Sequence, residues 1–483
     1  MSSRHMRTAI GAVLTVAAGL LWQAPAAAAE PSTLAAVCNL HCDGRDPAQA
    51  SADRIPVTAA LFGRTFALHV SDTDTMGWAT VSGGQAGDEV WLDRSFDGGR
   101  SWSSGSSLGR TSIAAGATQA RTTMANVDGW GTRGVGVLRA CGKAGDRTDV
   151  ACTAWARSTW NAGDRRTAAA TALMMRFDQG NAMFDSNGWW TGANALTALI
   201  DNIRVTGMRS YEYAIAASYD RLINERQGQF RNEYSDDTGW WAMAWIAAYD
   251  LTGNARYLET ARAGAEHMHT FWDSRCGGGV YWRTDRTSKD AISNSLYIQV
   301  NAALSQRIAG DVTYRGRAQT GWSWFQGTGM ITESNTVINH IDLTTCRGTS
   351  GPLTYTQGVL INGLVQLNRL TGDAGALAAA RRIADSAIVN THLHQNGIVR
   401  EPGETDSCSG DAPAWKGAYI RGIGALNAVT GGAYNAYLKR QADSLYAANR
   451  NSFDAYGPHW AGPFVGTSHL CQQSALDLLN VAP

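Results

Sequence analysis

Two adjacent aspartates in the middle of the chain are the residues best placed for chemistry. Asp236 and Asp237 stand side by side in the segment NEYSDDTGWW, shortly before a glycine and two tryptophans. Repulsion between two such carboxylates raises one pKa, while a helix N-terminus and neighbouring donors can keep the other group ionised. A nucleophile and a proton donor are what glycoside hydrolysis requires, and sequence neighbours favour the short separation, roughly 5–5.5 Å, of a retaining mechanism. We expect Asp237 to have the higher pKa, because it must hold a proton when a sugar arrives.

The same residues also allow a purely structural interpretation. Ser235 can cap a helix that continues through GWWAMAWIAAYD, and acidic residues are favoured in the first turn of any helix. Three features favour catalysis over this alternative. The pair begins a helix at the loop-rich end of the predicted fold, tryptophans flank it, and no competing catalytic constellation occurs elsewhere in the sequence.

A repeated turn divides the second part of the chain into helices. After about Asp164 the apolar residues recur with a period of 3.6, and turns that end in glycine separate an apolar helix from an amphipathic one. These turns read VTG, LTG or IAG and lie at 205–207, 251–253, 308–310, 370–372 and 429–431. With a first helix near 165–178 and a last near 468–480, they predict twelve helices. We therefore expect residues 163–483 to form an (α/α)6 toroid, six inner helices ringed by six outer ones.

The connections between these helices differ in length, and this difference locates the active face. The glycine turns are tight, whereas each outer helix is followed by a long loop in which Gly-Trp pairs and acidic residues gather. If the helices alternate up and down, all six long loops share one end of the toroid. Long loops on a rigid scaffold are where function concentrates. The sequence therefore predicts that Asp236 and Asp237 lie at this end.

Two segments precede the helical region. Residues 1–29 combine two early arginines, an apolar run and an alanine-rich cleavage site, as a secretory signal peptide does. Residues 30–158 alternate short Val, Trp and Phe runs with glycine turns, which predicts a small all-β domain of unassigned role. We expect the mature chain to be secreted and extracellular.

Export makes the eight cysteines a disulfide-permissive set. On topology, Cys276–Cys346 and Cys408–Cys471 would each staple neighbouring loops, Cys141–Cys152 would close a β-hairpin, and Cys38–Cys42 would remain. None of the spacings forms a paired C-x-x-C zinc pattern. The histidine pairs His267/His269 and His392/His394 are interpreted as ordinary surface histidines.

Composition excludes some classes of protein and favours another. The 41 basic and 41 acidic residues cancel, which gives no electrostatic footprint for nucleic acid, and no segment beyond the N-terminal one is apolar enough to span a bilayer. The 18 tryptophans and 15 tyrosines are typical of secreted carbohydrate-active proteins, although most such rings fill the core of any fold. We expect a monomer without a metal or cofactor.

Several motifs occur together in the order of one known family. NEYSDDTGWWAMAWIAAYDLTG is preceded by ANALTALIDNIRVTG and followed by CGGGVYW, TYTQGVLINGL, WKGAYIRGI and QQSALDLLN. From about residue 165 to the C-terminus the chain therefore resembles glycoside hydrolase family 76, α-1,6-mannanases of (α/α)6 fold. The resemblance implies that Asp236 is the nucleophile and Asp237 the general acid/base, with a covalent mannosyl-enzyme intermediate and retention of configuration.

Further residues are candidates for binding the sugar. Relatives often show N-E-L where this chain has Asn294-Ser295-Leu296, and T-Y-N-Q-G around Tyr355-Thr356-Gln357, which leaves the subsite contacts open. Only four lysines occur, and two of them begin inner helices. The candidate sugar platforms are Trp189, Trp190, Trp240, Trp241 and Trp282, and the candidate polar ligands are Lys289, Asn294, Tyr355, Gln357 and Lys416.

The leading hypothesis is a secreted, retaining endo-α-1,6-mannanase that acts on mannan polysaccharide or oligosaccharides. Six long loops at one end should form an open groove, so that a polymer lies across it and is cleaved internally. Two alternatives remain at this stage. A mannan transglycosidase would use the same intermediate, and a non-catalytic mannan-binding protein would not need the intact aspartates.

Overall fold

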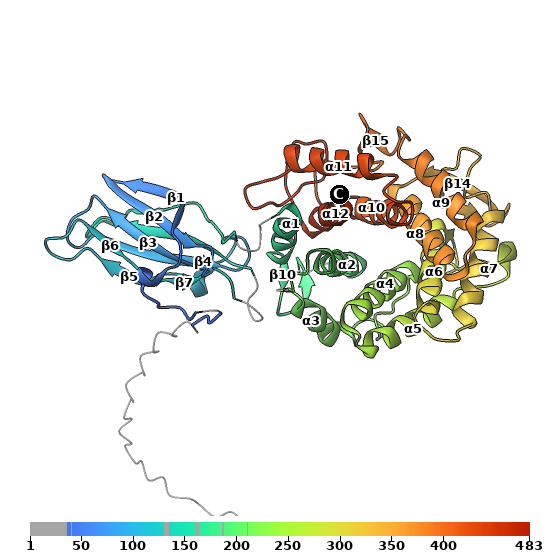
Figure 1. Ribbon diagram of the computed structural model, residues 1–483, viewed down its shortest axis with the longest axis horizontal. Coiled ribbons are helices and arrows are strands. Elements are labelled where there is room, and N and C mark those ends of the chain that lie inside the picture. The colour runs from blue at the N-terminus through green and yellow to red at the C-terminus, as the bar shows by residue number, and fades with distance from the viewer. Residues whose placement is uncertain (1–35, 40, 130–134, 160–163, 186–187, 210) are drawn as a thin grey trace, which may run out of the picture. The chain divides into compact units, whose positions relative to one another are not determined.

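The computed structural model describes residues 36–483 apart from 40, 130–134, 160–163, 186–187 and 210 (Figure 1). The predicted signal peptide, residues 1–29, lies outside the described residues. Within the described part of the chain, no helix is both long enough and apolar enough to cross a membrane.

Residues up to about 158 form two antiparallel sheets, as the alternating pattern predicts. One sheet has the order β1-β2-β3-β6, with β7 also paired to β3, and the other has the order β5-β4-β8-β9. Phe66 and Leu68 of the first sheet and Leu92 and Leu138 of the second are fully buried in one shared apolar cluster. The strands are β1 (Arg54–Leu61), β2 (Arg64–Ser71), β3 (Met76–Ser82), β4 (Glu89–Ser95), β5 (Leu108–Ser112), β6 (Gln119–Arg121), β7 (Ala125–Asn126), β8 (Val137–Lys143) and β9 (Val150–Cys152).

The rest of the described chain is mainly helical. Its helices are α1 (Arg165–Met174), α2 (Trp189–Thr206), α3 (Tyr213–Leu222), α4 (Ser235–Thr252), α5 (Ala255–His269), α6 (Ala291–Ser305), α7 (Thr313–Gly327), α8 (Thr354–Thr371), α9 (Ala374–Ala387), α10 (Ala412–Val429), α11 (Asn435–Ala448) and α12 (His469–Val481). The predicted first helix, near 165–178, ends a turn earlier than expected, at Met174.

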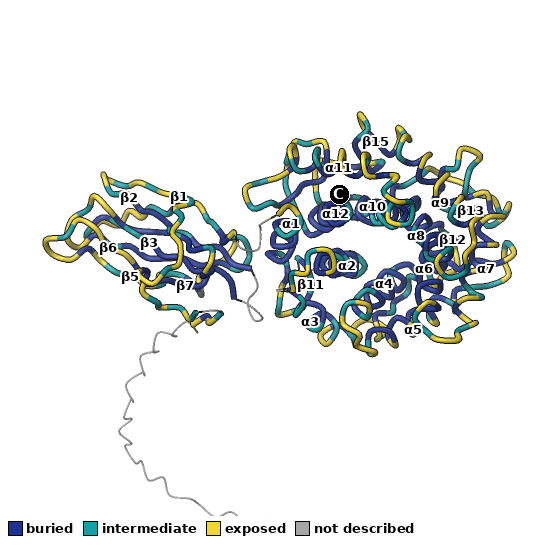
Figure 2. Tube along the Cα trace, viewed as in Figure 1, coloured by how far each residue is buried: buried dark blue, intermediate teal, exposed yellow. Residues whose placement is uncertain are grey.

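Six of these helices form a closed ring. Each of α2, α4, α6, α8, α10 and α12 packs against the next, and α12 packs back against α2 (Figure 1). All fifteen residues of α6 are buried, whereas α9, outside the ring, buries only an alanine- and isoleucine-rich stripe. Figure 2 shows the same contrast, with dark blue ring helices and yellow segments at the periphery.

Tight turns join each ring helix to the outer helix that follows it. α2, α4 and α8 end at Gly207, Gly253 and Gly372, whose φ values of 72°, 69° and 75° lie in the left-handed region that stops a helix. The connections from an outer helix to the next ring helix are long and span 175–188, 223–234, 270–290, 328–353, 388–411 and 449–468. Because they all lead into ring-helix N-termini, the predicted grouping of the long loops at one end is confirmed.

Short strands and disulfides order these long loops. β10 (Phe177–Asp178) pairs with β11 (Met183–Phe184), β15 (His394–Gln395) pairs with β16 (Ile398–Val399), and β12 (Lys289–Asp290), β13 (Ile338–Asp342) and β14 (Arg347–Pro352) form a three-stranded sheet across two loops. The four predicted disulfides are all confirmed: Cys276–Cys346, Cys408–Cys471, Cys141–Cys152 and Cys38–Cys42.

Candidate active site

The aspartate pair lies in the first turn of α4, at the loop end of the ring. The helix begins at Ser235, so the prediction that Ser235 caps it is wrong: Tyr234 occupies the N-cap and makes no side-chain capping bond. The Ser235 hydroxyl instead donates to the Tyr281 carbonyl oxygen at 2.7 Å. This bond fixes the start of α4 to the neighbouring 270–290 loop.

Asp236 is the more deeply buried of the two aspartates, with 9% of its surface exposed. Its Oδ2 accepts a hydrogen bond from Trp282 Nε1 at 3.1 Å, and its Oδ1 accepts one from the backbone N–H of Asp237 at 3.1 Å. Burial, then the charges of Asp237 and Asp290, raise the pKa of Asp236 well above its usual range, against the lowering effect of Trp282.

Asp237 has a different set of neighbours. Its Oδ2 accepts a hydrogen bond from Asn232 Nδ2 at 2.6 Å. Burial raises the pKa of Asp237 to about 6, although the Asn232 bond lowers it. The carboxylates of Asp411 and Glu233 also raise this pKa.

The pKa of each aspartate is raised, and two such close groups titrate as a unit. The expectation that Asp237 has the higher pKa of the two stays a prediction. The charge of Asp290, which directly precedes α6, acts on Asp236 through the fold.

Tyr355, in the first turn of α8, lies within electrostatic reach of Asp236. Burial raises the pKa of Tyr355 well above its usual range, and the charges of Asp236 and Asp290 add to that effect. The Tyr355 ring stacks on Trp415, with centroids 4.7 Å apart and planes 16° apart. This stacking fixes the orientation of the phenol.

Trp190 and Trp240 form a second aromatic pair near the site. Their rings stack with centroids 5.9 Å apart, and Trp190 Nε1 donates to Asp411 Oδ1 at 3.2 Å. Asp411, directly before α10, is one of the charges that act on Asp237. Trp282 donates to Asp236, and Trp240 follows Asp236 by about one helical turn on α4.

Trp189 and Trp241 have a different position from the other candidate platforms. Both pack on Phe230, at centroid distances of 6.0 and 4.7 Å, and Trp241 is only 1% exposed. Trp241 is therefore a core residue. Trp189 is half-buried, and Trp240 is 6% exposed within the same core cluster. As sugar platforms Trp189, Trp190, Trp240 and Trp282 stay predictions.

The two candidate lysines are buried and bonded within the protein. Lys289 Nζ donates to Asp273 Oδ1, to the Arg275 carbonyl and to the Gly278 carbonyl, at 2.7, 2.7 and 2.6 Å. All three of its donors are thereby used. Lys416 Nζ pairs with Glu404 at 2.5 Å and also donates to the Pro458 carbonyl. Sugar binding by either lysine stays a prediction.

Asn294 and Gln357 share one structural role. Each is the fourth residue of its ring helix, and each side-chain amide both accepts from and donates to the backbone of one valine in the preceding loop. The Asn294 amide accepts from the Val280 N–H at 2.8 Å and donates to the Val280 carbonyl oxygen at 3.0 Å. The Gln357 amide makes the same two bonds with Val337, at 2.8 and 2.6 Å. Their amides are therefore engaged, and sugar binding by them also stays a prediction.

Sequence reasoning missed Asn232, Asp290, Asp411 and Trp415. A signal existed for the two acids, because each directly precedes a ring helix, in the same part of the repeat as Asp236. Asn232 and Trp415 had no such signal. Their roles come from contacts that only the folded chain makes.

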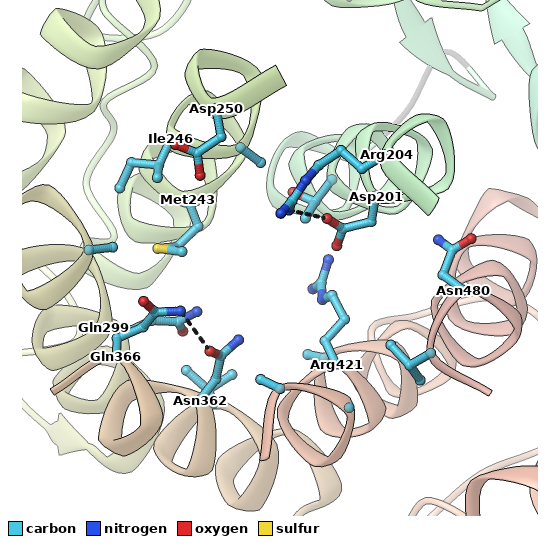
Figure 3. Close-up of a pocket in the computed structure, with 18 of the residues that line it drawn as sticks. Asp201, Arg204, Met243, Ile246, Asp250, Gln299, Asn362, Gln366, Arg421 and Asn480 are labelled. Carbon is cyan, nitrogen blue, oxygen red and sulfur yellow. Dashed lines mark hydrogen bonds and ion pairs between the residues drawn. The ribbon is translucent and has the colours of Figure 1, made fainter. Parts of the chain in front are cut away.

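A cavity of about 470 Å³ lies along the axis of the ring (Figure 3). Its wall comes from the second halves of the ring helices and includes the Asp201–Arg204 ion pair at 3.2 Å. Arg421 points towards Asp201 in the same view. The cavity contains neither Asp236 nor Asp237, and it shares only Trp240 with the aromatic groups around them. It therefore extends from beneath the pair towards the tight-turn end.

One group in the described part of the chain brings three possible metal ligands within 4.8 Å of one another: Asp93, Cys141 and Cys152. The two cysteines are bonded to each other in a disulfide, so their sulfur atoms are not thiolate ligands. The aspartate pair of α4 remains the arrangement with chemical potential. A helical ring that carries two close, buried carboxyls at its loop end has the functional groups of a glycoside hydrolase.

Comparisons with known proteins agree with this class. The model of glycosyl hydrolase family 76 matches residues 161–478. Mannan endo-1,6-alpha-mannosidase DCW1 of Saccharomyces cerevisiae is 23% identical over 297 residues, which cover 57% of this chain and 65% of that protein. The chain thus spans slightly less than two thirds of this relative's length.

Two solved structures share the fold of the helical region. An inactive variant of an α-1,6-mannanase of Salegentibacter sp., with substitutions of two adjacent aspartates and in complex with α-1,6-mannotetrose, has a TM-score of 0.60 at 23% identity. That match covers 66% of this chain and 98% of that one. Dfg5 of Chaetomium thermophilum, in complex with glucosamine, has a TM-score of 0.58 at 18% identity, and the match covers 66% of this chain and 90% of that one.

Because the family model matches residues 161–478, the chain belongs to glycosyl hydrolase family 76.

Proposed function

We propose that this protein is a secreted, retaining endo-α-1,6-mannanase that hydrolyses the backbone of α-1,6-mannan. The observation that carries the proposal is the pair of adjacent, buried carboxyls of Asp236 and Asp237, each with its own side-chain donor. The printed activity of the Saccharomyces relative and the mannotetrose bound to the Salegentibacter neighbour support the choice of substrate. The inactivity of a neighbour that lacks two adjacent aspartates supports the choice of residues.

The reaction proceeds in two displacements. In the first, a carboxylate oxygen of Asp236 attacks the anomeric carbon, the bond to the leaving sugar oxygen breaks, and the proton of Asp237 passes to that oxygen. In the second, Asp237 takes a proton from water, the water oxygen attacks the anomeric carbon, and the ester bond to Asp236 breaks. Both inversions together retain configuration.

The proton must be on Asp237 when the first bond breaks, although burial raises the pKa of Asp236 as well. The positive charge that develops at the anomeric carbon favours an ionised Asp236. Substrate therefore shifts the shared proton towards Asp237, whose pKa of about 6 is suited to donation and return.

The fold supports internal cleavage. We assign the ring to an (α/α)6 toroid, residues 163–483, and the two sheets to a separate domain, residues 30–158. The six long loops surround the ring-helix N-termini, and an open groove between them lets a polymer lie across the pair. The four disulfides, which use all eight cysteines, favour an oxidising compartment and so a secreted protein.

The test is digestion of purified α-1,6-mannan. Hydrolysis gives shorter mannan oligosaccharides with new reducing ends. Longer chains formed at the expense of short ones would indicate a transglycosidase instead, and binding without any change in chain length would indicate a non-catalytic mannan-binding protein.

A further inference from the structure

Asn232 is a buried side chain whose orientation is determined by its neighbours. It is 5% exposed and lies in the loop just before α4. Its Oδ1 accepts the backbone N–H of Tyr234 at 3.0 Å, and its Nδ2 donates to Asp237 Oδ2 at 2.6 Å. A backbone N–H can only donate, so the amide oxygen must face Tyr234. The amide nitrogen must then face Asp237.

Asn232 is also held from the outer layer of the ring. The backbone carbonyl oxygen of Asn232 lies 2.9 Å from Nε2 of His267, on α5. A carbonyl can only accept, so this nitrogen carries the hydrogen. His267, expected from sequence to be an ordinary surface histidine, is half-buried, and burial lowers its pKa so that the ring stays neutral near pH 7. His267 thus ties the backbone of Asn232 to α5, while the Asn232 side-chain amide bonds to Asp237.

The direction of these bonds determines where Asp237 can hold a proton. Asn232 Nδ2 has only hydrogens to offer, so a proton on Asp237 Oδ2 would point at another donor. The proton therefore sits on Oδ1, the oxygen that is not engaged by Asn232. Proton transfer to and from a sugar oxygen needs one defined oxygen, because small errors in position cost large factors in rate.

We propose that Asn232 is the positioning residue of Asp237: its side-chain amide, oriented by Tyr234 while His267 anchors the backbone of Asn232, fixes Oδ2 and directs the exchangeable proton to Oδ1. The inference rests on the proposed function, since it supplies the orientation that the general acid/base needs. The amide also opposes the effect of burial on the pKa, which keeps Asp237 able to give up its proton and regain it. Without the amide, Asp237 would hold its proton too tightly.

The other charges that face Asp237 are known from the structure. Asp236 is on the same helix, Glu233 and Arg226 belong to the preceding loop, and Asp411 precedes α10. Replacement of Asn232 leaves all four in place. A change in titration can therefore be attributed to the lost amide.

Two variants test the proposal. Asn232→Asp keeps the size and the acceptor for Tyr234 but turns a carboxylate towards Asp237, and Asn232→Ala removes the donor to Asp237 together with the acceptor for Tyr234. Loss of one charge-assisted hydrogen bond should raise the Asp237 pKa by about one to two units, and the Asp variant should raise it at least as far. Asn254→Asp is the matched control, because Asn254 is the exposed N-cap of α5 and an aspartate caps equally well.

The titration is read without substrate, from ¹³C signals of the aspartate carboxyls, and the pH profile of kcat/KM is read with mannan. We expect both Asn232 variants to move the titration of the carboxyl pair to higher pH and the control to titrate as the wild type. A folded Asn232 variant with unchanged carboxyl pKa values would overturn the proposal, as would a uniform loss of rate with no shift in the pH profile. Shifted carboxyl signals in a protein that does not cleave mannan would retain the positioning role and refute the proposed function.

Discussion

At the scale of single residues, the proposed activity depends on the two adjacent aspartates. The type and adjacency of Asp236 and Asp237 were visible in the sequence, but the groups that shift their pKa values were not. Asp290 acts on the pKa of Asp236 and Asn232 on the pKa of Asp237, and both reach the pair through the fold. Local sequence can therefore identify a carboxylate pair, whereas its titration is a property of the assembled site.

Asp236→Asn and Asp237→Asn should each remove activity while preserving the fold. Loss of general acid/base catalysis alone costs about 10²–10⁴ in rate, and loss of the nucleophile should cost at least as much. Both carboxyls have raised pKa values, so they cost folding free energy above the ordinary aspartate pKa, and the amide variants should unfold at the wild-type temperature or higher near pH 7. Mannan turnover and thermal unfolding check this. A folded variant with near-wild-type turnover would refute the assignment.

The pH dependence of activity should be bell-shaped. The active form holds one proton on the pair: at low pH both carboxyls are protonated, and at high pH both are ionised. Because the pKa of each carboxyl is raised, the acid limb of kcat/KM should lie above the ordinary aspartate pKa. Rates of mannan cleavage measured from about pH 4, near the ordinary pKa of a carboxyl group, to about pH 9 check this. A profile with only one limb, or an acid limb near pH 4, would count against a shared proton.

At the scale of elements, the sequence specified the helices better than the contacts made by their side chains. Glycine turns and loop lengths are local signals, and they predicted the ring helices and the end at which the loops gather. The contacts made by four polar side chains could not be predicted from nearby residues: Asn294, Gln357, Lys289 and Lys416. Their partners, such as Val337 and Pro458, lie in loops that only the fold brings near. The polar side chains at the starts of α6 and α8 thus hold loops, a role that their position in the sequence did not indicate.

A glycine pair at the contact between α8 and α10 should be intolerant of substitution. A Cβ on Gly422 would lie 2.0 Å from the Gly358 carbonyl oxygen, so Gly422→Ala must push two ring helices apart. We expect a loss of about 1–3 kcal/mol in the free energy of unfolding. Gly316→Ala in the outer helix α7 is the control, because a Cβ there meets nothing within 4 Å. It should stabilise by about 0.5–1 kcal/mol. Urea unfolding of both variants checks the contrast, and equal effects would contradict the close packing of the ring.

At the scale of the whole molecule, disulfides keep the loop face in place. Cys276–Cys346 spans 70 positions and ties the 270–290 loop, which carries Trp282, to the 328–353 loop. Cys276→Ser with Cys346→Ser should lower the free energy of unfolding by about 4 kcal/mol, since the unfolded chain regains that loop's freedom. Denaturant unfolding measures the loss. Because Trp282 donates to Asp236, KM for mannan should rise as well, and an unchanged KM would show that the staple does not order the site.

The central claim is double displacement in an open groove, and the first product of mannan cleavage tests it most directly. Proton NMR during the first minutes of digestion of a long α-1,6-mannan reads both the anomer and the chain length of what is released. We predict oligosaccharides of mixed length whose new reducing ends are initially α. A β anomer at the outset would mean that the aspartates act through a water molecule with inversion, and mannose alone would mean that the groove is closed at one end.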